Sequence, residues 1–482
     1  MSELPTFLKS GEAARLIPTV ADTSKEGRAV SILLASMMAV RPFTEELLSS
    51  LGQRIGKRSE IECYREIVFQ TSIKGDRPDG LIICRSGKKE WRALVEGKIA
   101  RAKIDADQIQ RYAEIARSNN IDAVITISNE LAALPTHGPT QLPKTLSKHV
   151  KLYHWSWISI LTQAQLVFAN SDFEDEHEHF ILSELIRFLA HPSTGISSYD
   201  TMAPAWKELC GKIQAGAPIV RNSEVVSDAV ASWHQEEKDL CLLLSRELAS
   251  PVQIKMSRTQ REDRLARLND DADALCDTFR LISTFDTPNT AAPLEVTCDF
   301  RRRSVMCSMK LRAPEDKKRN TAKINWLLRQ LSHTSDDRIF IRATWPRRAN
   351  DTYEKLIDIR ENPSILEVGH EEQSLISFEV TMIESLTGSF SSPRKFIQIV
   401  EAFVPAFYRD VGEHLRAWIP PPPKMREPES GAPDPTPNGD SANPTQVASE
   451  EEAPTASTGT PKQADRSVFV SEAPWHWLRR NN

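Results

Sequence analysis

Two neighbouring apolar runs decide the fold of the N-terminal part of the chain: Arg77-Pro78-Asp79-Gly80-Leu81-Ile82-Ile83-Cys84 and Trp91-Arg92-Ala93-Leu94-Val95-Glu96-Gly97-Lys98. Between them lies the turn sequence Ser86-Gly87-Lys88-Lys89. Two short apolar runs joined by a glycine-containing turn are typical of a β-hairpin. The sequence therefore predicts antiparallel strands over 81–84 and 91–95, with an acidic residue near the same end of each strand.

The segments around this hairpin alternate between helical and strand periods. Helices are predicted over 28–40, over 44–52 with Thr44 as the N-cap, over 105–118 and from the end of the last strand to 167, and further strands over 61–69, 123–127 and 150–155. This order predicts an α/β domain with a mixed sheet flanked by helices, over residues 28–170.

The rest of the 482-residue chain is long enough for further folded units. We expect an N-terminal extension over 1–27, a helical region over 171–285 with one continuous helix over 260–279, and an α+β C-terminal domain over 286–419. The Pro-rich segment 420–482 has almost nothing to bury, and it is expected to be disordered. Its apolar and basic end, 468–480, is a candidate docking motif for a protein partner; an incidental end is the alternative.

Composition restricts the class of protein. The formal net charge of −5 gives no general attraction to nucleic acid, so any contact with DNA requires a local basic patch. The seven cysteines form no CxxC pair and are expected to be reduced and mostly buried. No apolar run approaches the ~20 residues of a membrane-spanning helix, and the first residues show no secretory signal. We therefore expect a soluble cytoplasmic protein without a membrane partner.

The chemistry is concentrated at the acidic end of the hairpin. Successive side chains of a strand point to opposite faces, so Glu96 and Lys98 project on the same face, and Asp79 joins them from the neighbouring strand. Two converging carboxylates repel each other, and a hard divalent cation removes that repulsion by binding oxygen from both. With the positive charge of a lysine beside them, these groups are the parts needed for metal-assisted attack on a phosphodiester.

The pattern Pro78-Asp79, then Glu96-Gly97-Lys98, then Gln108-x-x-x-Tyr112 on the next helix resembles the PD-(D/E)xK nuclease superfamily and its RecB-type branch with a QxxxY element. The resemblance covers roughly residues 30–170 and implies a restriction-endonuclease-like fold. It implies that Asp79 and Glu96 are ligands of Mg²⁺ or Mn²⁺ and that Lys98 orients or helps to deprotonate the attacking water.

The same resemblance implies that Gln108 and Tyr112 position the DNA phosphate or the metal-bound water. The superfamily commonly places a further glutamate on its first helix. For this role we expect Glu46; the other candidates are Glu45, Glu62 and Glu66.

The function implied is that of a Mg²⁺-dependent deoxyribonuclease, acting in defence against foreign DNA or in repair. A second interpretation keeps the fold without the activity, as an interaction protein of a stress response that acts through its C-terminal domain and tail. A third takes Asp79 as a turn residue, Glu96 and Lys98 as a surface ion pair worth under ~1 kcal/mol, and Tyr112 as core.

Three other groups of residues are weaker candidates. His154, which stands just before Trp155 and Trp157 at the end of a strand, is interpreted as packing rather than as a catalytic base. The segment Asp175–His179 is interpreted as a solvated helix start rather than as a metal site. The basic residues near the C-terminal domain's first hairpin are interpreted either as a DNA contact or as a solvated edge; they are Arg301, Arg302, Arg303, Lys310, Arg312, Lys317, Lys318 and Arg319.

Overall fold

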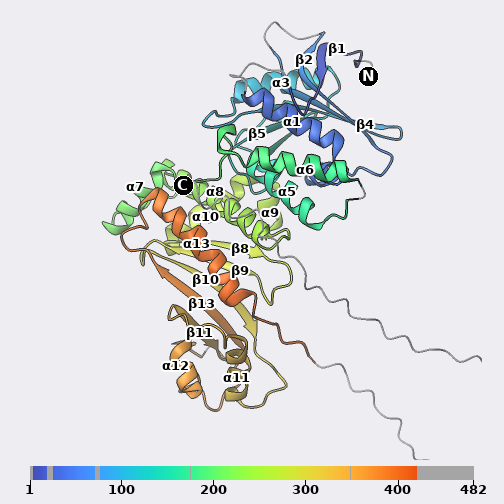
Figure 1. The fold of residues 1–482 in the computed structure, drawn as a ribbon. Helices are drawn as coiled ribbons and strands as arrows, with labels where there is room; N and C mark the ends of the chain where they lie inside the picture. The colour runs from blue at the N-terminus through green and yellow to red at the C-terminus, as the bar shows by residue number, and fades with distance from the viewer. Residues whose placement is uncertain (1–3, 19–24, 71–75, 174, 348, 421–482) are drawn as a thin grey trace, which may run out of the picture. The chain divides into compact units, whose positions relative to one another are not determined.

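The computed structural model describes residues 4–18, 25–70, 76–173, 175–347 and 349–420. Residues Met1–Pro420 form one compact unit that contains two β-sheets (Figure 1). The expected disordered segment and the candidate docking motif at 468–480 lie outside the described residues. Among those described, none of the helices combines the length and apolar character needed to cross a membrane.

The first sheet is mixed and has six strands in sequence order. These are β1 (Leu8–Ala13), β2 (Glu60–Phe69), β3 (Gly80–Ser86), β4 (Lys89–Gly97), β5 (Ala123–Ser128) and β6 (Lys151–Ser156). The first four strands pair antiparallel, whereas β5 and β6 continue parallel to β4. The central hairpin predicted from the sequence is present, with Gly80 paired to Val95 and Ser86 to Lys89.

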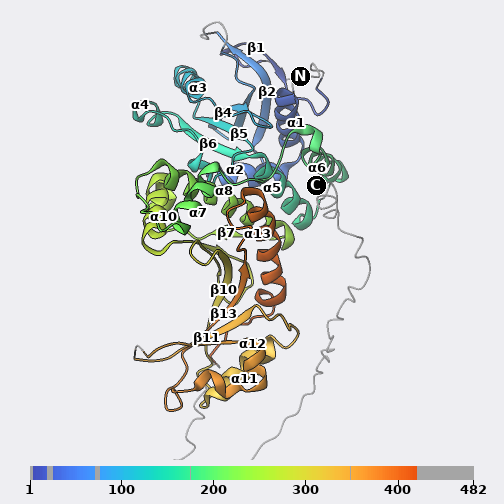
Figure 2. The same ribbon diagram turned by 90° about the vertical axis from the view of Figure 1, so that its left-hand side faces the viewer.

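Helices cover both faces of this sheet, as Figure 2 shows. One face packs against α1 (Lys25–Ala39), α2 (Arg41–Ser50), α5 (Trp157–Asn170) and α6 (Glu176–Leu189). The other packs against α3 (Ala106–Ser118), where Leu81, Ile83 and Leu94 meet Ile109 and Ala113. The strands between the two layers are apolar on both sides, and β5 is buried along its whole length.

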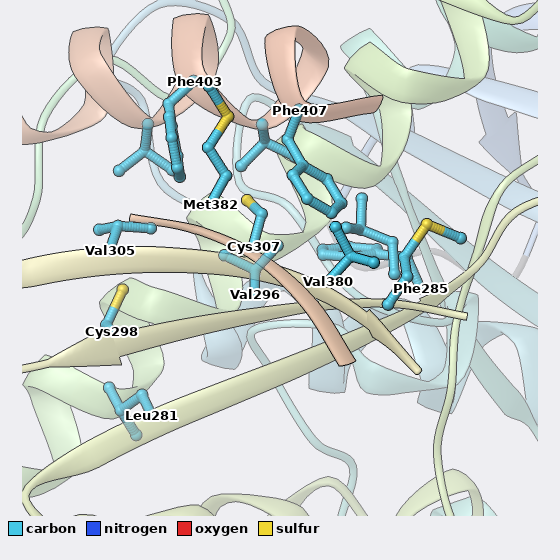
Figure 3. Packing of buried hydrophobic residues seen from close by; sticks show 14 of the residues in the cluster. Leu281, Phe285, Val296, Cys298, Val305, Cys307, Val380, Met382, Phe403 and Phe407 are labelled. Carbon is cyan, nitrogen blue, oxygen red and sulfur yellow. The ribbon is translucent and has the colours of Figure 1, made fainter. Parts of the chain in front are cut away.

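The second sheet is antiparallel and has seven strands, in the order β12-β11-β13-β10-β9-β8-β7. Its strands are β7 (Gln253–Ile254), β8 (Arg280–Asp286), β9 (Leu294–Asp299), β10 (Ser304–Arg312), β11 (Ile339–Thr344), β12 (Thr352–Lys355) and β13 (Ser377–Ser385). The amphipathic helix α13 (Pro393–Phe407) lies along this sheet (Figure 1). Phe403 and Phe407 contribute to the same buried cluster as Val305, Cys307 and Met382 of the sheet (Figure 3).

The other helices of the second part are α7 (Pro204–Gln214), α8 (Glu224–Glu247), α9 (Arg258–Glu262), α10 (Arg264–Thr278), α11 (Asn320–Gln330) and α12 (Leu356–Glu361); the short helix α4 (Lys144–Ser147) belongs to the first part. Two tryptophans anchor α7 and α8 in the core. The indole N–H of Trp206 donates to the carbonyl of Phe390 over 2.9 Å, and that of Trp233 donates to Ser283 over 3.0 Å.

Three predictions that were based on local sequence signals are wrong. Thr44 is no N-cap, because α2 begins at Arg41 with Pro42 in its first turn, and the buried Thr44 hydroxyl donates to Val40 O over 3.1 Å inside the helix. The helix expected over 260–279 is broken at Asp263, which is extended and caps α10. Residues Leu8–Ala13, expected in an extension, form an edge strand on β2.

The cysteines are as expected from their spacing. All seven are free, and six of them are buried; only Cys276 is partly exposed. Burial raises the pKa of Cys63 and of Cys307, so these thiols stay protonated in the apolar interior. They therefore act as small apolar side chains.

Candidate active site

Asp79 and Glu96 lie at the same end of the β3–β4 hairpin. Asp79 comes directly before β3, and Glu96 is the penultimate residue of β4. The Asp79 carboxylate accepts a hydrogen bond of 2.9 Å from the backbone N–H of Gly97. This bond fixes the aspartate across the end of the hairpin, beside the strand that carries the glutamate.

Glu96 is the centre of the cluster. Its Oε1 accepts hydrogen bonds from Lys98 Nζ over 2.6 Å and from Gln108 Nε2 over 2.9 Å. The residue is only 2% exposed, so the interpretation of Glu96 and Lys98 as a surface ion pair is wrong. Its second oxygen, Oε2, is buried and has no hydrogen-bond partner. A buried carboxylate oxygen without a partner is costly, and it marks a place where a ligand would be stabilised.

The helix α3 carries Gln108 and Tyr112 and packs against the sheet beside Glu96. Asp105 caps its N-terminus by accepting from the backbone N–H of Asp107 over 2.9 Å. One turn apart, Gln108 and Tyr112 face the same way, and Gln108 Nε2 donates to the Tyr112 hydroxyl over 2.9 Å. Gln108 thus connects Glu96 to Tyr112, and it holds the carboxylate from the helix side.

The structure does not bring Glu46 to this cluster. Glu46 lies on α2, where it accepts a long hydrogen bond of 3.5 Å from Gln163 of α5. The three other glutamates considered for the same role have partners of their own: Glu45 pairs with Arg41 at 2.9 Å, Glu62 with Arg85 at 2.8 Å, and Glu66 with Arg77 at 2.5 Å.

Glu26, in the first turn of α1, lies beside the cluster instead. Its negative charge acts on Asp79, Glu96 and Lys98, and its Oε1 accepts from the backbone N–H of Ile99 over 3.4 Å. The sequence did not point to Glu26 because Gly27 is a poor helix former, so the helix was expected to begin only at position 28. It begins three residues earlier. The signal available was an acidic residue in the first turn of a strongly apolar helix.

Close contact between α1 and the hairpin explains this placement. A Cβ atom added to Gly97 would lie 2.5 Å from Val30 Cγ2, and one added to Gly80 would lie 2.5 Å from Leu34 Cδ1. Only glycine allows the helix to approach the end of β4 so closely. The two glycines next to the acidic residues therefore set the distance from which Glu26 reaches the cluster.

The electrostatics follow from this crowding of negative charge. Burial and the charge of Glu96 raise the pKa of Asp79 to about 7, although the Gly97 N–H and Lys98 oppose the shift. Burial also raises the pKa of Glu96. Burial lowers the pKa of Lys98, but the bonded Glu96 outweighs it and the net shift is upward. Lys98 therefore keeps its proton in this arrangement and acts as a cation and hydrogen-bond donor.

The donor set fits a hard divalent cation. Asp79 and the unpartnered Oε2 of Glu96 supply carboxylate oxygens, which Mg²⁺ and Mn²⁺ prefer. Among the described residues, no group of three or more His, Cys, Asp and Glu side chains is arranged to hold a metal ion. A cation here would therefore be held by one or two carboxylates, with the other positions left to backbone oxygen, water and substrate, as is common for Mg²⁺.

The histidine candidates have structural roles. His154 is buried, and its ring nitrogens hydrogen-bond Thr126 Oγ1 and the carbonyl of Glu130, each over 2.8 Å. Burial lowers the pKa of His154 to about 4, so the ring is neutral. Asp175 is the N-cap of α6 and accepts from the backbone N–H of His177 over 2.8 Å. These hydrogen bonds are made to residues outside the carboxylate cluster.

Comparison with protein-family models and with curated protein sequences gives no match to this chain.

Proposed function

We propose that the chain is a metal-dependent nuclease with a restriction-endonuclease-like N-terminal domain that hydrolyses phosphodiester bonds of DNA. One observation carries the proposal: Glu96, buried in the sheet, shares one oxygen between Lys98 and Gln108 and keeps the other oxygen free. Glu236, the other buried glutamate with unbonded oxygens, has neither oxygen bonded; Glu96 differs because a lysine and an amide hold one oxygen and leave the second oxygen in a fixed place for a ligand.

The sheet supports the fold part of the proposal. An antiparallel hairpin that carries the acidic residues is followed by a helix that carries Gln108 and Tyr112, and then by a strand parallel to β4. This is the order of strand, strand and helix on which the PD-(D/E)xK and QxxxY elements are expected.

Each side chain has a defined task in the proposed reaction. A bound divalent cation would supply positive charge that offsets the two carboxylates and polarises the scissile phosphate. Asp79 and Glu96 would hold it, and the Gly97 N–H keeps Asp79 in position. Lys98, protonated and 2.6 Å from Glu96, places a positive charge where the negative charge of the phosphate grows in the transition state.

Gln108 and Tyr112 complete the cluster on the helix side. Burial and the charge of Glu96 raise the pKa of the Tyr112 hydroxyl, so the group stays protonated. It accepts from Gln108 and keeps its own hydrogen for a phosphate oxygen. The products would be a 5′- or 3′-phosphate and a hydroxyl, formed by water without a covalent enzyme intermediate.

A cleavage assay with matched variants tests the proposal. Wild type, Asp79→Asn and Lys98→Met would be incubated with plasmid, linear duplex, single-stranded DNA and RNA, with Mg²⁺ or Mn²⁺. The matched control is Asp76→Asn, the same change three residues earlier, where the side chain pairs with Arg111 at 3.2 Å.

We expect wild type and Asp76→Asn to cleave DNA and the other two variants to lose at least about a hundredfold in rate while keeping their folded circular dichroism spectrum. Wild type that cuts no substrate, or variants at Asp79 and Lys98 that cut normally, would overturn the proposal and favour the interaction protein.

A further inference from the structure

A surface pocket of about 890 Å³ lies beside α11 in the second part of the chain. It is lined by Lys317, Lys318, Arg319, Ala322, Asn325, Leu328, Arg329, Ser332 and Arg360. Five of these nine residues are cationic, and none is acidic. The pocket is therefore a concentrated positive site in a chain whose formal net charge is −5.

The cations of the pocket are largely free of acidic partners. Lys317 pairs with the neighbouring Asp316 at 3.4 Å. Within the described part of the chain, Lys318 and Arg319 make no ion pair, and Arg329 bonds only the carbonyl of Asn325, over 3.2 Å. Three positive side chains are thus exposed on one side of α11 without neutralisation, an arrangement that repels itself until an anion binds.

The structure separates this pocket from the other basic residues of the region. Arg301, Arg302 and Arg303 form the turn between β9 and β10, whereas Lys317–Arg319 follow the opposite end of β10. The nine residues of β10 place the two groups roughly 30 Å apart. In the turn, Arg301 stacks on Phe279 at 3.8 Å, and Asp299 accepts from the Arg302 backbone N–H over 2.8 Å. In the turn the Arg301 guanidinium is held against an aromatic ring, whereas among the described residues Lys318, Arg319 and Arg329 of the pocket make no ion pair; Arg360 donates to the carbonyl of Leu331.

We propose that the pocket beside α11 binds the phosphate backbone of a nucleic acid, away from the carboxylate cluster. Guanidinium groups match the geometry of phosphate oxygens, and lysines add charge without requiring a fixed direction. Asn325 contributes a further hydrogen-bond donor at the wall, whereas the Ser332 hydroxyl donates to the Arg329 carbonyl over 3.0 Å. The choice of nucleic acid as the anion rests on the proposed function, because a second phosphate contact would hold the DNA that the carboxylate cluster cleaves.

Contacts of this kind act through charge rather than through base edges. They add affinity for any sequence, and they weaken with salt because bound cations are released from the nucleic acid. The pocket is therefore expected to increase affinity without selecting a sequence, and any selectivity of the nuclease would have to come from elsewhere.

A binding experiment with matched double variants tests the inference on the full chain. Fluorescence anisotropy of labelled duplex and single-stranded DNA would be followed with EDTA present, so that binding is measured without cleavage. The pocket variant is Arg319→Gln with Arg329→Gln. The control is Arg302→Gln with Arg303→Gln, which removes the same two charges of the same type from the distant turn. Polyglutamate serves as the competitor that represents an acidic protein.

We expect the pocket variant to bind DNA about tenfold more weakly at low salt. The slope of log K against log[salt] should decrease in magnitude by about one to two, as for the loss of one to two phosphate contacts. The control should bind like wild type. Equal binding by the two variants, a loss confined to the control, absence of DNA binding by wild type, or stronger competition by polyglutamate than by unlabelled DNA would each overturn the inference. Normal DNA binding through the pocket without cleavage by wild type would instead overturn only the proposed function.

Discussion

Gln108 of α3 donates to Glu96 of β4 over 2.9 Å and to Tyr112 over 2.9 Å, so a single amide joins the helix to the buried carboxylate. The carboxylate has an additional bond from Lys98 on the same oxygen. Removing the amide would leave Glu96 held by one donor instead of two. The position of its free oxygen therefore depends on a residue that lies outside the strand.

The first prediction concerns this amide. Gln108→Leu is expected to lower the rate of DNA cleavage about tenfold to a hundredfold. Gln108 holds the Glu96 carboxylate in position, and a mispositioned carboxylate slows the reaction. Tyr112→Phe keeps the ring in the core and removes only the hydroxyl, so it should cost less. Rates measured at saturating Mg²⁺ check this, and equal rates for wild type and Gln108→Leu would contradict it.

The second prediction separates two glutamates. Glu26→Gln is expected to lower cleavage at least about tenfold, because the charge of Glu26 acts on all three members of the cluster. Glu46→Gln, the change first suggested by the resemblance, should leave the rate within about twofold, since its partner is Gln163 on α5. The opposite ranking in the same assay would restore Glu46 to the site.

The third prediction is a pH dependence of metal binding. With the pKa of Asp79 raised to about 7 by burial and by Glu96, protons compete with a cation for this carboxylate near neutral pH. The dissociation constant for Mg²⁺ should therefore decrease as pH rises from about 6 to about 8 and then level off. Isothermal titration calorimetry measures this directly, and Asp79→Asn should abolish most of the pH dependence; a flat profile in wild type would count against Asp79 as a ligand.

The fourth prediction concerns the glycine under α1. Gly97→Ala places a Cβ 2.5 Å from Val30 Cγ2, and it is expected to lower the free energy of unfolding by about 1–3 kcal/mol. Gly211→Ala, inside α7 with open space around the added atom, should raise it by about 0.5–1 kcal/mol. Urea unfolding monitored by circular dichroism measures both changes. No loss of stability in Gly97→Ala would show that α1 adjusts freely.

The fifth prediction concerns Glu236, which is completely buried on α8 with neither carboxylate oxygen bonded. Burial, with the charges of Glu401 and Asp239, raises its pKa well above the ordinary value, and the pKa of Glu401 on α13 is raised to about 7. The folded state keeps these protons while the unfolded chain releases them. The stability that they contribute is therefore present in acid and is lost as pH rises through the raised pKa values.

Glu236→Gln should remove part of the stability loss that occurs as pH rises. At pH 8 the variant is expected to be more stable than wild type by about 1–3 kcal/mol, and the difference should shrink near pH 5. Asp228→Asn, an exposed change on the same helix, should have little effect at either pH. Urea unfolding at the two pH values gives the comparison, and a variant that is less stable than wild type at pH 8 would contradict the burial argument.

Much of the first sheet could be predicted from the sequence because its signals are local. The hairpin of β3 and β4 was expected from two apolar runs and a Gly87 turn, and α3 from the apolar stripe that includes Ile109 and Ala113. The edge strand β1 could not be predicted in this way. Its burial pattern shows a single buried residue, Leu8, and its pairing partner β2 lies about fifty residues further along the chain.

The candidate site, too, could be predicted only in part from the sequence. The placement of Asp79 and Glu96 at one end of the sheet follows from hairpin register, and the spacing of Gln108 and Tyr112 follows from the helical repeat. The choice of Glu26 over Glu46 does not follow from either. It depends on how α1 crosses the end of β4, and that crossing is set by the absence of side chains at Gly80 and Gly97.

The sequence by itself determined which residues are apolar on which period, and hence the hairpin, the helix after it and the carboxylates at their ends. Only the tertiary structure decided that Glu96 is buried with one oxygen free, that Glu26 joins it, and that Lys317–Arg319 share a pocket with Arg329 and Arg360. The physical reason is that local periodicity fixes the direction of a side chain along its own element, whereas burial and charge depend on neighbours far away in the chain.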